Sequence, residues 1–276
     1  MAESLTWIAG DSSTFTLNAA ATSGRGVSGI EGIGLPTLEC QAKAYPFLHG
    51  LMDIGRKYRD RTVQIAYWQL FNSRSAWQTG RETLRNALNS ALGMGQLKYV
   101  DENAVEWRLD CWVVNAPMPR AALQYTTLKT VIELWAPWPF WRKASAETAN
   151  KDFNGASNVD IAISNDGNMP TIPSTITLAA GAGETIINPV LTVLSTGEKI
   201  DLDHTVAAGE TVTITCFPPE DADVVKSGSS IIGDLTYDSV LVGFEIPRGN
   251  QTVRIVGDAG SNGNCLVSFY EWFLSI

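Results

Sequence analysis

The chain has 276 residues, of which 45% are hydrophobic and 18% are charged, and its formal net charge is −9. Such a composition is typical of a folded protein and excludes a disordered one. No run of about 18 apolar residues predicts a membrane-spanning helix, and no cationic cluster predicts sequence-specific binding of nucleic acid.

The character of the chain changes near residue 147. Residues 1–146 hold 15 Lys+Arg and 12 Asp+Glu, a net charge of +3, whereas residues 147–276 hold 5 and 17, a net charge of −12. All but one of the tryptophans precede residue 147, and the exception is Trp272. A joint shift in charge and aromatic content predicts two domains, 1–146 and 147–276.

The first ten residues carry Glu3 and show neither a basic nor an apolar region, so we expect no signal peptide there. The cysteines, at positions 40, 111, 216 and 265, lie far apart and form no CxxC pair. Cys40, Cys111 and Cys216 fall on the apolar side of alternating runs. We therefore expect buried, reduced thiols and no zinc site.

Glycines crowd residues 22–36, which we interpret as a loop. Residues 24–29 match the dinucleotide fingerprint GxGxxG, but Gly32, Gly34 and Pro36 forbid the following helix that a pyrophosphate would need. A mobile or interface loop is favoured. Beyond it, Val63-Ile65-Tyr67, residues 105–111 and residues 128–134 alternate between apolar and polar positions, which predicts strands.

One helix is predicted over about residues 80–92. Thr79 and Glu82 have the spacing of a capping box, and Leu84, Leu88 and Leu92 recur on one face. Gly93 suits the left-handed end of a helix.

Residues 135–141 (WAPWPFW) combine three tryptophans, Trp135, Trp138 and Trp141, with two prolines. Two interpretations remain open: a plug that closes the core of the first domain, and an anchor that faces a partner. Residues 142–157 are polar, rich in small residues and weakly periodic, which predicts a linker.

The second domain consists of short alternating runs separated by turns, and eight or so strands at this spacing predict a two-sheet sandwich. The predicted strands are residues 159–164, 172–178, 186–194, 199–202, 210–216, 239–246, 251–256 and 265–273.

No catalytic motif emerges, and no cofactor is indicated. His49 and His204 lie in different domains, without a partner for a metal or a serine elbow for a triad. Asp201 and Asp203 beside His204 are interpreted as exposed acids. The run 220–223 (EDAD) is interpreted as a solvated loop, with weak Ca²⁺ binding as the alternative.

Turn and strand markers along nearly the whole chain resemble those of the distal tail proteins of long-tailed phages, the Dit family. In the first domain these markers are GIGLP at 32–36, Gly55, RDRTVQI at 59–65, the helix at 81–92, RLDC at 108–111 and PWPFW at 137–141. In the second they are NDGNMP at 165–170, Pro173, NP at 188–189, TGEKI at 196–200, GE at 209–210, PRGN at 247–250 and Tyr270. Each marker is weak by itself, and their order and spacing carry the resemblance.

The resemblance implies a mainly β protein. It implies an N-terminal tail-tube-like β-barrel or sandwich with one α-helix, and a C-terminal galectin-like β-sandwich. Six copies are expected to form a ring with a channel for DNA. The ring would join the tail tube protein to a tail-tip or baseplate hub protein and to receptor-binding or fibre proteins, in a virion assembled in host cytoplasm.

A carbohydrate-binding module used in host attachment is the alternative, and a hydrolase is a third hypothesis that nothing specific favours. If the ring is right, we expect its contacts to come from aromatic, glycine and arginine positions of the first domain. The candidates are Trp135, Trp138, Trp141, Arg25, Gly29, Gly34, Arg56 and Arg59.

Overall fold

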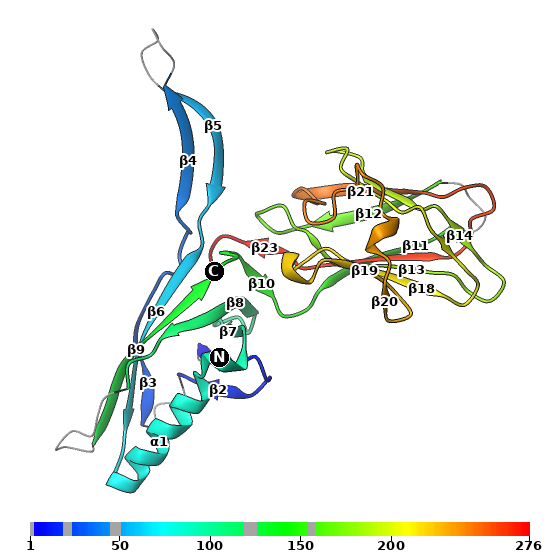
Figure 1. Cartoon of the computed structure of the whole chain (residues 1–276). Coiled ribbons are helices and arrows are strands. Elements are labelled where there is room, and N and C mark those ends of the chain that lie inside the picture. Colours follow the sequence, from blue (N-terminus) through cyan, green and yellow to red (C-terminus); the bar gives the residue numbers. More distant parts are fainter. Residues whose placement is uncertain (1–2, 19–23, 45–50, 119–125, 154–157) are drawn as a thin grey trace. The chain divides into compact units, whose positions relative to one another are not determined.

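The computed structural model describes residues 3–18, 24–44, 51–118, 126–153 and 158–276; of residues 43–44 and 51–54 it describes the backbone only. Strands make up 51% of the described residues, and α1 (Arg74–Ala87) is the α-helix among them (Figure 1). The mainly β class with one α-helix is thereby confirmed. None of the sheets that these residues form closes into a barrel.

Two compact units divide the chain. The first contains residues 1–144 and 273–276, and the second contains residues 145–272. The predicted break after residue 146 lies close to this boundary, whereas the return of residues 273–276 to the first unit has no signal in the sequence.

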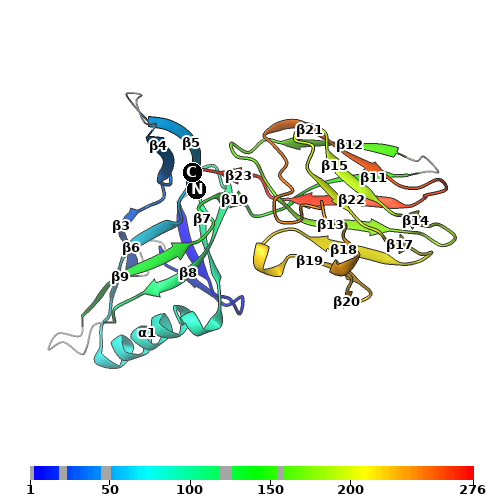
Figure 2. The same ribbon diagram turned by 45° about the horizontal axis from the view of Figure 1, so that its top comes forward.

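The first unit is built on one large sheet with the order β2-β1-β7-β8-β9-β6-β3, beside which β10 pairs with β8 and β23 (Figure 2). Its strands are β1 (Ser4–Ile8), β2 (Thr14–Thr16), β3 (Arg25–Glu31), β6 (Arg61–Leu70), β7 (Gly95–Val100), β8 (Glu106–Asn115), β9 (Thr127–Ala136), β10 (Trp141–Lys143) and β23 (Trp272–Phe273).

Period-2 alternation places the core of this unit as predicted. Val63, Ile65 and Tyr67 of β6 are at most 1% exposed, and Leu128 and Ile132 face them from β9. Trp77 and Leu84 of α1 belong to the same core cluster. Because β6 and β9 pair over ten residues in continuous register, their alternating faces stay aligned throughout.

The glycine-rich loop predicted for residues 22–36 is wrong, because residues 25–31 form β3 and pair with β6. A bulge between Val27 and Gly29 accommodates the glycines in the strand. Gly32 then turns the chain at φ +85°, and an added Cβ there would lie 2.0 Å from the Thr62 carbonyl oxygen. Pairing with a neighbouring strand outweighs the low strand propensity of glycine here.

Helix α1 begins earlier than predicted. Its N-cap is Ser73, whose hydroxyl accepts from the amide of Ala76, so the capping box at Thr79 and Glu82 is wrong and both residues lie inside the helix. The helix ends at Ala87, and a short 3₁₀ turn, η2 (Ser90–Leu92), follows. Leu84 and Leu88 are buried, so the predicted apolar stripe does face the core.

The predicted linker at 142–157 is also wrong in its described part. Residues 141–143 form β10, and β11 (Glu147–Asp152) pairs with β22 (Asn264–Phe269) in the second unit. Polar side chains at these positions reflect exposure of β11 and not absence of structure, because every residue of β11 is exposed or half-buried.

A buried arginine ties the ends of the first unit together. Arg61 is 3% exposed and donates to the backbone carbonyls of Pro139 (3.0 Å), Gly32 (3.0 Å), Gly34 (2.7 Å) and Leu274 (2.5 Å). Burial lowers the pKa of Arg61 to about 10, so the side chain stays charged at neutral pH. It thereby fastens residues 273–276 to the sheet.

Strands β4 (Leu38–Ala44) and β5 (Leu51–Tyr58) form a separate two-stranded sheet, which we call the ribbon. It extends beyond the end of the large sheet in both views (Figures 1 and 2). The amide of Arg59 donates to the carbonyl of Thr37 at its base. Cys40 lies on this ribbon and is exposed, which contradicts the predicted burial of that thiol.

The second unit contains a six-stranded sheet, β11-β22-β13-β18-β19-β20, a four-stranded sheet, β12-β21-β15-β16, and the pair β14-β17. The remaining strands are β12 (Asn158–Asn165), β13 (Pro173–Ala179), β14 (Ile186–Ile187), β15 (Val190–Val193), β16 (Lys199–Asp201), β17 (Thr205–Val206), β18 (Thr211–Thr215), β19 (Asp223–Lys226), β20 (Ser229–Ser230) and β21 (Gly249–Val256). The 3₁₀ turns are η3 (Pro219–Asp221) and η4 (Ile232–Asp234).

Most strands of the sandwich follow the predicted pattern, with one clear error. Residues 239–246 form no strand, and Ile246 makes a single bridge to Thr171. Val240 and Val242 are about two-fifths exposed at 39% and 41%, so the alternation there is not a buried face. Cys216 and Cys265 are buried as thiols, in line with expectation. No helix of the described residues is long and apolar enough to cross a membrane.

Candidate protein interface

One face of the large sheet, over β8, β9, β6 and β3, exposes large apolar side chains. Trp112 and Trp135 lie directly opposite each other on β8 and β9 and are 37% and 38% exposed. Val131, four residues before Trp135 on β9, is 46% exposed. Tryptophans are favoured at the centres of protein interfaces, and clustered exposed apolar residues mark such sites. This face is the candidate interface.

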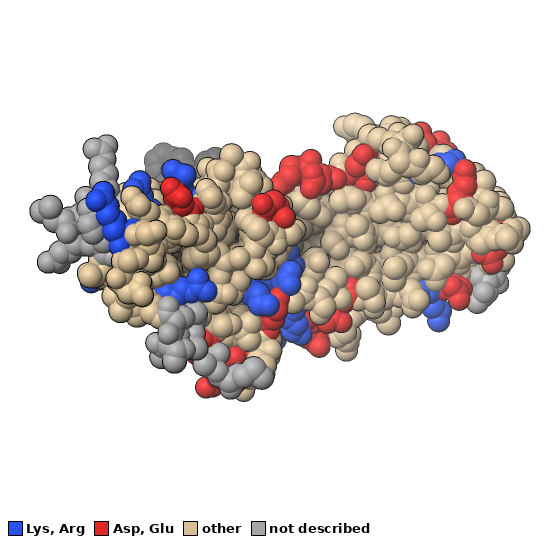
Figure 3. All heavy atoms as spheres, turned by 90° about the horizontal axis from the view of Figure 1, so that it is seen from below, with Lys and Arg blue, Asp and Glu red and all other residues tan. Residues whose placement is uncertain are grey.

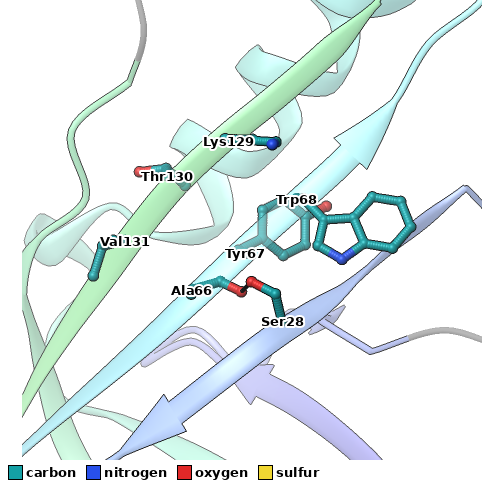
Figure 4. A pocket seen from close by; sticks show the side chains of 7 residues that line it. All are labelled: Ser28, Ala66, Tyr67, Trp68, Lys129, Thr130 and Val131. Atoms are coloured by element: carbon teal, nitrogen blue, oxygen red, sulfur yellow. Dashed lines mark hydrogen bonds between the residues drawn. The ribbon is translucent and has the colours of Figure 1, made fainter.

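Farther along the same face the surface is hollowed. Val131, Ala66 and Gly29 lie side by side on β9, β6 and β3, and two of them have almost no side chain. Figure 4 shows the residues that line this hollow, which has a volume of about 500 Å³. A second hollow of about 270 Å³ adjoins it at Ala66 and Val131. A Cβ added at Gly29 would have no atom within 4 Å, so the floor is open there.

Two unlike walls flank this floor, and we call the whole depression the sheet groove. Trp68 and Lys129 form one wall, and a Cβ added at Gly26 would lie 3.3 Å from the Trp68 ring, which shows how closely the indole covers β3. The other wall contains Gln64, Glu31 and Glu133, which occupy one row of the register. One wall is thus aromatic and basic, and the other is acidic.

The other part of the same sheet, around β7, β8 and β10, carries paired charges instead. Arg142 donates to both carboxylate oxygens of Asp110 at 2.8 and 3.0 Å. Glu106 pairs with Lys98 and Arg108. Burial opposes the ionisation of Glu106, but hydrogen bonds from these two cations outweigh it and lower its pKa. The charges there satisfy one another within the chain.

The tryptophans of residues 135–141 divide between the two interpretations. Trp135 belongs to the exposed face, where its indole nitrogen donates to Asp60 at 2.5 Å. Trp138 is half-buried, and Trp141 is fully buried in the core. The segment therefore fills the core at Trp141 and exposes an aromatic side chain at Trp135.

The other candidates fall in three places. Gly29 lies on the floor of the groove, and the carbonyl of Gly34 accepts a hydrogen bond from Arg61. Arg25 turns away from the face, with its guanidinium 5.3 Å from the centre of the Phe15 ring. Arg56 and Arg59 belong to the ribbon and its base. The structure thus brings Trp135 and Gly29 onto one face and places the two arginines on the ribbon.

Sequence reasoning missed Trp68, Ala66, Val131 and Trp112 as parts of this face. A signal was present, because Trp68 and Ala66 alternate with the buried Ile65 and Tyr67 on β6. A tryptophan on the polar side of an alternating strand is a mark of a second contact surface.

The second unit also exposes large apolar side chains, among them Ile232, Tyr237, Val240 and Val242. His204 contacts Asp234 at 2.9 Å and Lys226 at 3.3 Å, and Lys226 pairs with Glu210 at 2.9 Å. His49 lies outside the described residues. Within the described ranges no group of three or more His, Cys, Asp or Glu is arranged to hold a metal ion. On the face shown in Figure 3, acidic and basic residues are scattered over a mostly uncharged surface.

Solved structures of phage proteins have the same fold. The crystal structure of the Dit protein of phage SPP1, described as a paradigm of the hub adsorption apparatus in phages that infect Gram-positive hosts, matches with a TM-score of 0.69. The match covers 99% of this chain and 100% of that one, at 11% identity. The fold is that of a phage Dit protein.

Chains of the phage p2 baseplate, in its activated conformation with Sr or with Ca, match with a TM-score of 0.57. These matches cover 97% of this chain and 98% of the other at 9% identity. No protein-family model matches the chain, and no match was found among curated proteins. The likeness to known proteins is therefore one of fold, and it extends over nearly the whole chain.

Proposed function

We propose that this protein is a structural component of the tail tip of a long-tailed phage, a subunit of a hexameric ring that joins the end of the tail tube to the baseplate and receptor-binding proteins. The observation that carries this proposal is the match of the entire chain, both units together, to the SPP1 Dit protein. A chance likeness of one common β sandwich would not extend over 99% of the chain.

The surface of the first unit supports a ring subunit. Strand β3 is an end strand of the large sheet, the ribbon is a separate two-stranded sheet, and Trp112 and Trp135 are exposed on β8 and β9. Neighbouring copies would cover such edges and faces, and a closed ring leaves none uncovered. The role is structural and involves no catalysis, and the channel of the ring would pass DNA without reading its sequence.

Gold-labelled antibodies against this chain, applied to purified virions, test the proposal. We expect label at the end of the tail distal to the capsid, and a ring with a central hole in negatively stained purified protein. Virions that lack the polypeptide at that end would refute the proposed function.

A further inference from the structure

The two larger sheets of the second unit end in the strands β11, β20, β12 and β16, and these ends differ in how they are protected. An end strand presents a row of unpaired N–H and C=O groups with which another chain can pair. Strand β20 has only two residues and offers a short edge. Strand β16 is covered by the segment that follows η4, because Leu202 forms a bridge with Leu235 and the amide of Thr236 donates to the carbonyl of Asp201 at 2.9 Å.

Strand β11 is protected by charge. Glu147 lies opposite the buried Phe269 of β22, and Lys151 lies opposite the buried Cys265. Residues that are paired in an antiparallel register point to the same side of the sheet. Glu147 and Lys151 therefore point to the core side, although both are exposed. Inward-pointing charges are one of the devices by which natural proteins prevent an end strand from pairing with another chain.

Strand β12 has none of these protections. Among the described residues it pairs with β21 alone, over all eight of its residues and without a bulge. It contains neither proline nor lysine, and its inward positions are apolar at Val159, Ile161 and Ile163. Its one charged residue, Asp160, accepts two hydrogen bonds from Arg254, at 2.7 and 2.9 Å. The edge of β12 is therefore long, regular and open.

The chemistry of this edge selects an extended chain as its partner. Alternating N–H and C=O groups are matched by the backbone of one more strand, whose main-chain hydrogen bonds supply affinity while its side chains supply specificity. Eight residues of strand span roughly 26 Å. Ala162 and Ser164 are small and exposed on the outward face, so the added strand has room for aromatic or β-branched side chains beside them.

Charge disfavours a second copy of this chain as the source of that strand. Pairing of β12 with the β12 of another copy would bring together two units that each hold 5 Lys+Arg and 17 Asp+Glu, a net charge of −12. Like charges oppose such a contact. A neutral or basic segment of a different protein meets no such opposition.

We infer that the open edge of β12 binds an extended, neutral or basic segment of another tail-tip protein, which adds to the four-stranded sheet as one more strand. This deepens the proposed function, on which it rests, by naming a surface of the second unit and the kind of segment that fits it. The protection of β11, β16 and β20 directs the addition to this edge.

Amide exchange in purified tails tests the pairing. Alternate residues of an end strand direct their N–H groups away from the sheet, so we expect about half of the β12 amides to exchange quickly in the isolated protein. In tails these amides should exchange more slowly by about tenfold or more, whereas the amides of β21 should be slow in both samples. Tails that contain the chain with β12 exchanging as in the isolated protein would refute the inference alone. Tails without this polypeptide would refute the proposed function as well.

A photo-cross-linker identifies the occupant. Ala162→p-benzoylphenylalanine places the reactive group on the outward face of β12, and Thr177→p-benzoylphenylalanine, on the outward face of β13, is the matched control. After illumination of tails, we expect the first variant to join one segment of a different tail protein, and the second not to reach that segment. Cross-links between two copies of this chain, or none at all, would overturn the inference.

A blocking variant copies the protection found on β11. Val159→Lys gives β12 an inward-pointing charge at a half-buried position, and Thr252→Lys adds the same charge to the neighbouring strand β21. We expect tails with Val159→Lys to lose the slow exchange of β12 and tails with Thr252→Lys to keep it. Melting curves report whether both variants fold. Equal protection of β12 in two folded variants would contradict strand addition at this edge.

Discussion

Two strands of the first unit, β6 and β4, carry the same alternation of apolar and polar residues but differ in burial. In β6 the apolar Val63, Ile65 and Tyr67 are buried, whereas in β4 Leu38, Cys40 and Ala42 are exposed. The local pattern is equally regular in both. Alternation therefore predicts that one face of a strand will be buried. It does not tell whether the same chain or another molecule buries that face. The predictions below test this contrast, beginning with the largest effect.

A charge on the buried face of β6 should unfold the first unit. Ile65 is fully buried, so Ile65→Lys places an unpaired cation in the core, and we expect a loss of about 5 kcal/mol or more in the free energy of unfolding. The neighbouring Gln64→Lys, on the exposed face between Glu31 and Glu133, should change it by less than about 0.5 kcal/mol. Urea titrations of both variants measure the difference, and equal midpoints would refute the assignment of faces.

Substitution of two arginines at the junction of the ribbon and the sheet should change the free energy of unfolding by clearly different amounts. Arg61→Met removes the donor from four buried or half-buried carbonyls, and we expect a cost of about 3 kcal/mol. Arg59→Met breaks only an exposed pair with Glu39, so its unfolding midpoint should match that of the wild type. If both variants unfold at the same urea concentration, Arg61 does not fasten the sheet.

Thiol reactivity should distinguish Cys40 on the ribbon from the buried cysteines in the unmutated protein. Burial raises the pKa of Cys216 and of Cys265 to about 12 and raises that of Cys111 as well, so these thiols stay protonated and shielded at pH 8. In dilute, unassociated protein we expect Ellman's reagent to titrate Cys40 alone, and all the thiols after denaturation. Rapid reaction of a second thiol in the folded protein, or an unreactive Cys40, would contradict this.

Acid should loosen the ribbon by a small amount. A hydrogen bond from Arg59 lowers the pKa of Glu39 below its ordinary value, so the pair stabilises the folded ribbon above that value and is lost as the pH falls through the folded pKa. Amide exchange of residues 38–42 and 55–58 should therefore quicken in acid. In Glu39→Gln this pH-dependent step should vanish, and its persistence would show that another group causes it.

The sequence predicted the structure correctly where residues close in the sequence determine it. It failed where pairing with residues distant in the sequence determines it. The burial of Val63, Ile65 and Tyr67 followed from alternation alone. Strand β3 did not, because pairing with β6 overrides its glycines. The start of α1 was misplaced because Thr79 and Glu82 have the spacing of a capping box, whereas the cap is Ser73 and both residues lie inside the helix. For the candidate interface, Trp135 and Gly29 were predicted, but the groove between them required the register of three strands.

The return of residues 273–276 to the first unit also bears on how the protein is made. Leu274 gives its carbonyl to Arg61, and Phe273 packs edge-on against Trp107 with 4.9 Å between the ring centres. These residues leave the ribosome only after the entire second unit has been translated. Until then, Arg61 lacks one of its four acceptors, the Leu274 carbonyl, and Trp107 lacks the Phe273 ring. Completion of the first unit is therefore coupled to synthesis of the second unit, because residues 273–276 follow it in the chain.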